Sequence, residues 1–159
     1  PIYHGYVADI GFTGSLGENP ELQKAIQFLK TLRNEIPLLV NSGMRGGQIW
    51  SLIDKKIAAA GYANAYKKYP FSVLGHRVHT VTETGPLIKF MRFGWQSFWS
   101  IASRGIFSQL IREDSKNLPF GFWAIEPHLS GGTFGAKFEE ILLLTPSECH
   151  WLERDCAWA

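Results

Sequence analysis

Apolar residues in the first quarter of the chain recur at the spacing of one face of an α-helix. Asn19 is a typical N-cap, and Pro20 suits the first helical position. Helical spacing continues through about Asn34, with apolar positions at Leu22, Ile26, Leu29 and Leu32. The pattern therefore predicts an amphipathic helix that begins at Pro20 and runs to about Asn34.

Proline and glycine mark where helical structure should stop. Pro37 is expected to interrupt or kink the first helix, with a second short helical stretch over Leu38–Ser42. Another run of apolar residues at helical spacing extends from Gln48 to about Ala60. Gly61 is the expected C-cap of that second helix.

Other segments have the β-branched, aromatic or alternating character of strands. They are Ile2–Ala8, Phe71–Val81, Phe120–Ile125, Phe134–Thr145 and a short closing strand at His150–Leu152, with a turn at Ser130–Gly132. Strands flank the chain and helices lie between them, which predicts an α+β fold with a largely antiparallel sheet. The aromatic-rich segment 90–110 suits either core and dimer packing or a lid or apolar substrate pocket.

The composition excludes several classes of protein. The 159 residues suffice for one domain with a core, and 45% hydrophobic with 19% charged residues is typical of a soluble globular protein. A net charge of +2 is too small to indicate nucleic-acid binding, and no apolar run is long enough to span a membrane. Cys149 and Cys156 are interpreted as free thiols in a reducing cytoplasm, with a single disulfide as the alternative.

Four side chains are candidate ligands for divalent metal ions: Asp9 at a strand end, His76 in an extended segment, Glu126 before a proline, and Glu139 in the last long strand. Three of them have a ready structural interpretation as well. Asp9 suits a turn beside glycines, His76 a hydrogen-bonded strand position, and Glu139 a solvated pair with Glu140. Together, a carboxylate-rich set with one imidazole suits Mn, Co, Fe(II) or Zn.

The two glutamates carry the strongest signal for a site. Glu126 ends the apolar run Phe122–Ile125, and the proline after it restricts its backbone to the β region. Strand alternation places Lys137, Glu139 and Ile141 on one face. If the two glutamates lie on adjacent strands, their charges repel unless a cation lies between them, which favours a shared metal site.

The segments around these residues resemble the motifs of the pita-bread metallopeptidases, the family of Xaa-Pro dipeptidase, aminopeptidase P and creatinase. Ala8–Thr13 resembles the strand end that supplies a metal-binding Asp, and Leu74–His76 resembles the Gly-His segment. Trp123–His128 resembles the Ile-Glu-Pro segment, and Gly135–Glu140 is similar to the Gly-Val-Arg-Ile-Glu-Asp strand. The order Asp, His, Glu, Glu also agrees, over roughly Pro1–Leu152.

The resemblance implies a dinuclear metal site. Asp9, His76, Glu126 and Glu139 would bind two divalent ions, with Mn as the first choice and Co, Fe or Zn as alternatives. Glu139 would bridge the two ions. A further Asp of the family's ligand set would lie upstream of Pro1, so residues 1–159 would be the carboxy-terminal portion of a catalytic domain whose amino-terminal part is missing.

The resemblance also implies roles in catalysis. Glu126 would shuttle protons beside a metal-bridging hydroxide, and His79 or His128 would contact the oxyanion or the substrate. Lys137 stands where the family usually has Arg. Ser72 stands where a helper histidine is expected, so the preference for Xaa-Pro peptides is less supported than the metal site.

The fold and function that follow are those of the family. The expected fold is α+β, a partial pita-bread fold with a largely antiparallel curved sheet and flanking helices. The expected function is metal-dependent hydrolysis of peptide bonds, as by an Xaa-Pro dipeptidase or aminopeptidase P. Such an enzyme would act on short peptides in the cytoplasm as a homodimer, without nucleic acid or membrane. The alternatives are a metal-independent amidinohydrolase of creatinase type and a non-catalytic module that binds peptides or proteins.

Overall fold

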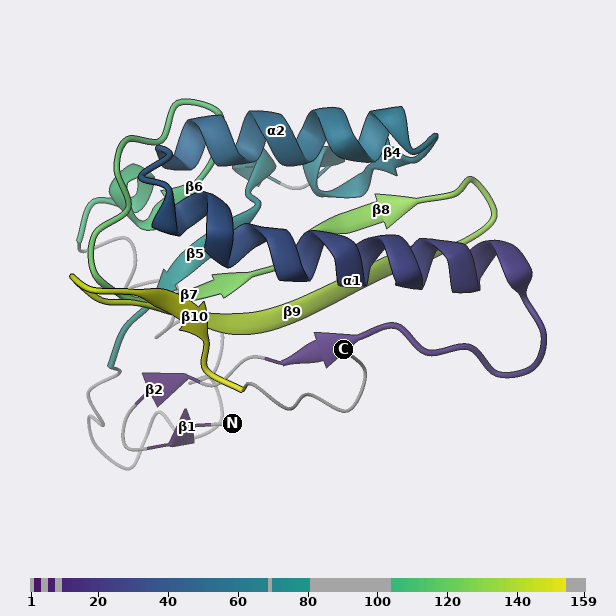
Figure 1. Cartoon of the computed structure of the whole chain (residues 1–159), viewed down its shortest axis with the longest axis horizontal. Helices are drawn as coiled ribbons and strands as arrows, with labels where there is room; N and C mark the ends of the chain where they lie inside the picture. The colour runs from purple at the N-terminus through teal and green to yellow at the C-terminus, as the bar shows by residue number, and fades with distance from the viewer. Residues whose placement is uncertain (1, 4–5, 8–9, 69, 81–103, 154–159) are drawn as a thin grey trace, which may run out of the picture.

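Two helices lie side by side over one antiparallel sheet in the computed structural model of the chain (Figure 1). The structure describes residues 2–3, 6–7, 10–68, 70–80 and 104–153. Helix α1 spans Pro20–Asn41 and helix α2 spans Gly46–Ala59. Within the described residues every strand pairing is antiparallel, so the predicted α+β class with a largely antiparallel sheet is confirmed.

The sheet is organised around one long central strand, β9. Its main path runs in the order β4-β8-β9-β7-β5-β6, and β3 and β10 also pair with β9. The strands are β3 (Gly11–Phe12), β4 (Ala63–Asn64), β5 (Gly75–Val78), β6 (Leu110–Ile111), β7 (Gly121–Ile125), β8 (His128–Ser130), β9 (Gly135–Leu144) and β10 (Cys149–Trp151). Short 3-10 helices occupy Ala65–Lys68, Pro70–Ser72 and Ile106–Gln109.

Helix α1 begins as predicted but does not end at Pro37. The Asn19 side chain accepts a hydrogen bond from the Leu22 N–H at 3.0 Å, as an N-cap does. Pro37 has no N–H, so the carbonyl of Arg33 loses its helical donor. The indole N–H of Trp151 on β10 donates to that carbonyl at 2.9 Å. The predicted interruption at Pro37, followed by a separate stretch over Leu38–Ser42, is therefore wrong, because a distant strand replaces the missing donor.

Two predicted strands differ from the observed ones. The described residues of Ile2–Ala8 form two short strands, β1 (Ile2–Tyr3) and β2 (Tyr6–Val7), which pair with each other. Within the described part of Phe71–Val81, the strand is β5, and Thr80 forms an isolated bridge with Tyr6. The segment does not begin as a strand, because Phe71 and Ser72 have left-handed backbones with φ of 70° and 51°. The Trp50 indole donates to the Ser72 carbonyl at 2.7 Å, which helps to hold that strained turn.

A buried ion pair fixes the orientation of β9 against α1. Arg33 donates from Nε and Nη2 to the Glu140 carboxylate at 2.8–3.0 Å, and the Trp151 ring lies 5.3 Å from the guanidinium carbon. Both charged side chains are buried. Because neighbouring strand residues point to opposite faces, Glu140 faces the helix layer and Glu139 faces away from it. The interpretation of Glu139 and Glu140 as a solvated pair is therefore wrong.

Several other predictions from the sequence concern segments that lie only partly within the described residues. Cys149 is a buried free thiol, and burial raises its pKa to about 12. Cys156 and most of segment 90–110 lie outside the described residues. No helix among the residues that the structure describes is both long and apolar enough to cross a membrane.

Candidate metal centre

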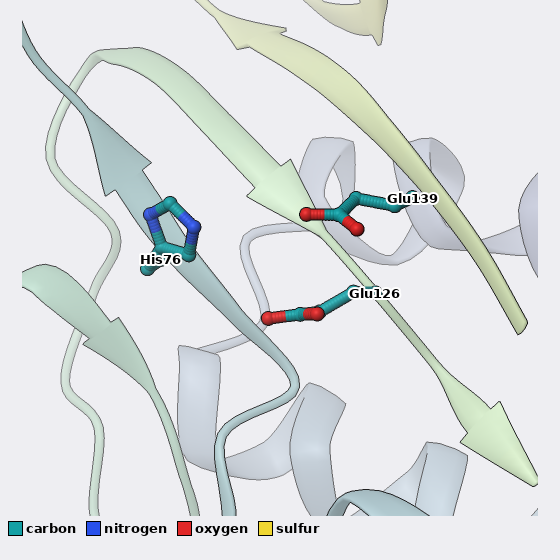
Figure 2. A group of neighbouring side chains, drawn as sticks. All are labelled: His76, Glu126 and Glu139. Atoms are coloured by element: carbon teal, nitrogen blue, oxygen red, sulfur yellow. The ribbon is translucent and has the colours of Figure 1, made fainter. Parts of the chain in front are cut away.

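Three of the four predicted ligands meet on the sheet face that points away from the helices. His76 lies on β5, Glu126 directly follows β7, and Glu139 lies on β9. One ligand atom from each lies within 4.8 Å of the others, and Figure 2 shows the three side chains directed into one space. Asp9 lies outside the described residues, although the strand that follows it, β3, pairs with β9 at Gly11↔Glu139.

The strand order explains this convergence. Strand β7 is bonded to β5 on one side and to β9 on the other, so residues at its end stand between His76 and Glu139. The N–H of Glu126 donates to the Leu74 carbonyl at 2.9 Å, which ties the chain after β7 to the start of β5. On the other side of β9, Gly11 lies so close to Glu139 that a Cβ added to Gly11 would be 3.7 Å from the Glu139 Cβ. Backbone pairing thus positions all three side chains.

His76 has one ring nitrogen engaged by the backbone. Its Nδ1 lies 3.2 Å from the carbonyl oxygen of Arg77. A carbonyl can only accept, so Nδ1 carries the proton in this contact and Nε2 keeps its lone pair. A backbone carbonyl on the second nitrogen is the usual support of a metal-binding histidine. His76 is therefore arranged to present Nε2 as a ligand.

Lys137 is the cation that accompanies the two glutamates in this structure. Its Nζ lies 2.9 Å from Glu139 Oε2 and 3.9 Å from Glu126 Oε2. The sequence placed Lys137 on the face of Glu139, but a direct contact with both carboxylates was not predicted. Since the lysine side chain is 40% exposed, it has room to move aside without unfolding the sheet.

The donor set fits divalent metal ions. One imidazole and two carboxylates suit Mn, Co, Fe(II) or Zn, and Glu139 is only 8% exposed, so its charge needs a close cation. His76, Glu126 and Glu139 would hold the ion.

His79 and His128, the other predicted catalytic residues, do not belong to this group of three. The Nε2 of His79 lies 2.7 Å from the Gln109 side-chain oxygen, which accepts, so Nδ1 keeps a lone pair. Burial lowers the pKa of His79, the hydrogen bond to Gln109 opposes that shift, and the nearby charges of Arg104 and Arg77 lower the pKa further. Gln109 was not predicted, because no local pattern in the sequence connects it with His79.

His128 lies beside the cluster on the next strand. It stands opposite Lys137 in the β8–β9 ladder, and its ring packs against Gly135, where an added Cβ would be 3.3 Å from Nε2. Burial lowers the pKa of His128, and the charges of Lys137 and Lys68 lower it further. The imidazole is thus placed on the same face as the three candidate ligands, one residue pair away from Glu139.

An α+β sheet that gathers an imidazole and two carboxylates on one face defines a candidate metal-binding protein, and sequence comparison gives its family. The sequence model of metallopeptidase family M24 matches residues 1–146, and the chain belongs to this family. No curated protein sequence gives a significant match.

Solved structures support the same fold. The chain is similar to an X-Pro aminopeptidase from Thermotoga maritima MSB8, with a TM-score of 0.63 and 21% identity over 94% of this chain and 36% of that one. It is also similar to a prolidase from Thermococcus sibiricus, with a TM-score of 0.61 and 19% identity over 96% of this chain and 35% of that one. A prolidase from Pyrococcus furiosus gives a TM-score of 0.60 and 19% identity over 94% of this chain and 38% of that one. The predicted pita-bread fold is confirmed, and the chain spans little more than a third of each of these structures.

The contact of Lys137 with Glu139 predicts that this lysine weakens metal binding. In the Lys137→Met variant, we expect the affinity for Mn(II) to rise about tenfold. An ammonium and a divalent ion about 6 Å apart repel by about 1.4 kcal/mol even at the dielectric constant of bulk water. Isothermal titration calorimetry measures the change, with Lys55→Met, an exposed position on α2, as the matched control. An unchanged or lower affinity in Lys137→Met would contradict the prediction.

Proposed function

We propose that this chain carries part of the active site of a divalent-metal-dependent peptidase that cleaves short peptides with proline after the scissile bond. The observation that carries the proposal is the convergence of His76, Glu126 and Glu139 within 4.8 Å in a chain of metallopeptidase family M24. Resemblance to structures described as prolidases and an X-Pro aminopeptidase supports the substrate class. Divalent ions, when bound, would supply an activated water for attack on the peptide carbonyl.

The two glutamates are suited to different tasks. The Glu139 side chain is 11% exposed and faces the other ligands, so it is placed to hold metal. The Glu126 side chain is 27% exposed, so a carboxylate oxygen can face the reacting peptide as well as the metal. Glu126 is therefore the better candidate to move a proton from water to the leaving amine.

The histidines outside the cluster are suited to substrate contact. His79 is held by Gln109 with Nδ1 open as an acceptor, and His128 lies on the cluster's face of the sheet. In this proposal they orient the peptide rather than bind metal.

Metal-dependent turnover tests the proposal. Purified protein loaded with Mn(II) is expected to hydrolyse Ala-Pro or Ala-Pro-Ala, to lose this activity with a chelator, and to regain it with added Mn(II) or Co(II). Measured Mn(II) binding without turnover of any peptide would overturn the catalytic proposal and favour a peptide-binding module. Hydrolysis of a guanidino compound such as creatine by the chelated protein would favour the amidinohydrolase instead.

A further inference from the structure

A pocket of about 340 Å³ lies at the hairpin that joins β8 to β9. The polar side chains that line it are Lys68, His128, Ser130 and Thr133, and Phe134 and Gly135 form part of its wall. Lys68 comes from the 3-10 helix Ala65–Lys68, so two separate parts of the chain build the pocket. None of these residues belongs to the three candidate ligands.

The pocket is suited to a negatively charged group. Its described lining contains a lysine, an imidazole and two hydroxyl groups, and no Asp or Glu. Lysine and imidazole with hydroxyl donors form a set that binds carboxylates through charge-assisted hydrogen bonds.

The pocket and the metal cluster share one face of the sheet. Residues Gly135, Lys137 and Glu139 alternate along β9 and so point to the same side. His128 stands opposite Lys137 and Ser130 stands opposite Gly135, so the side chains of His128 and Ser130 lie on the same face of the sheet as Lys137 and Glu139. A substrate lying along this face would pass from Glu139 over Lys137 and His128 to the pocket.

The distance along β9 between the candidate metal ligands and the pocket sets the length of that substrate. Glu139 lies four positions from Gly135 along β9, which corresponds to roughly 14 Å at about 3.4 Å per position. An extended peptide advances about the same distance per residue, so it needs about three to four residues beyond the scissile bond to reach the pocket. A dipeptide is too short.

We propose that this pocket is a subsite for the terminal carboxylate of an oligopeptide substrate, bound by Lys68 and His128 while the scissile bond lies at the metal cluster. The inference rests on the proposed peptidase function and narrows it, since it gives the chain a preference for oligopeptides over dipeptides.

Paired peptides test the subsite. The wild-type protein is expected to show a KM about tenfold lower for Ala-Pro-Ala-Ala-Ala than for the same peptide with a carboxy-terminal amide, the effect of one charge-assisted contact. In Lys68→Ala this ratio is expected to fall to about 1–2, and in Lys68→Arg it is expected to be retained. Lys67→Ala is the matched control, because the adjacent Lys67 pairs with Asp54. Equal KM values for the two peptides in the wild-type protein would overturn the proposal.

Binding without turnover separates this proposal from the peptidase proposal. Calorimetry of the same two peptides is carried out on chelated protein, in which metal-dependent hydrolysis cannot proceed. A preference for the carboxylate that disappears in Lys68→Ala supports the subsite even if no peptide is hydrolysed with Mn(II), a result that would overturn only the peptidase function. Equal binding of the two peptides would overturn the subsite even if hydrolysis is observed.

Discussion

Replacing Glu139 by glutamine is expected to lower the affinity for Mn(II) by about a hundredfold or more, and to remove metal-dependent peptide hydrolysis at ordinary metal concentrations. Glutamine keeps the size of the side chain and one carbonyl oxygen but removes the charge that faces His76 and Glu126. Loss of a residue that only supports a ligand typically costs about 10–100-fold in metal affinity, so loss of an anionic ligand costs at least the upper value.

The Glu139 variant needs a control for general charge effects. Glu148→Gln makes the same chemical change at a carboxylate that is 56% exposed, and its Mn(II) affinity is expected to equal that of the wild-type protein. Calorimetry measures both affinities, and circular dichroism checks that both variants are folded. If Glu139→Gln binds Mn(II) as tightly as Glu148→Gln, then Glu139 is not a ligand and the candidate centre is wrong.

The second large effect is on stability. Arg33→Met is expected to lower the free energy of unfolding by about 3–5 kcal/mol, because it leaves the buried Glu140 carboxylate without its cation. The Arg33 side chain also donates to the Glu153 carbonyl at 3.0 Å and lies against the Trp151 ring, so further contacts are lost. Urea unfolding followed by fluorescence measures the loss.

A double variant separates the cost of an unpaired charge from loss of packing. In Arg33→Met/Glu140→Leu both charges are absent, and apolar side chains of similar size fill the space. We expect most of the lost stability to return. A double variant as unstable as the sum of the two single variants would show that packing, and not the unpaired carboxylate, causes the loss.

Local patterns in the sequence predicted much of the fold. The N-cap at Asn19 and the apolar spacing after it located the start of α1, and the long apolar segment around Glu139 located β9 within one residue at each end. These features depend on neighbouring residues, which a single sequence displays. The convergence of His76, Glu126 and Glu139 was predicted from motif order and strand alternation, and the structure brings these three together.

The features that were not predicted depend on contacts between distant residues. The continuation of α1 through Pro37 requires the Trp151 indole, which lies 118 positions along the chain from the Arg33 carbonyl. Glu139 and Glu140 have opposite environments, because Glu139 pairs with Lys137 and Glu140 pairs with Arg33. Strand alternation assigns the two glutamates to opposite faces of the sheet, but it does not show which cationic side chain lies near each of them.

The most direct test of the metal centre is the anomalous scattering of crystals soaked with Mn(II). We predict a peak at coordination distance, roughly 2.0–2.3 Å, from His76 Nε2 and from carboxylate oxygens of Glu126 and Glu139, with Lys137 Nζ moved away from Glu139. A crystal in which Lys137 still binds Glu139 and no peak lies among the three side chains would contradict the assignment of this cluster as a metal site.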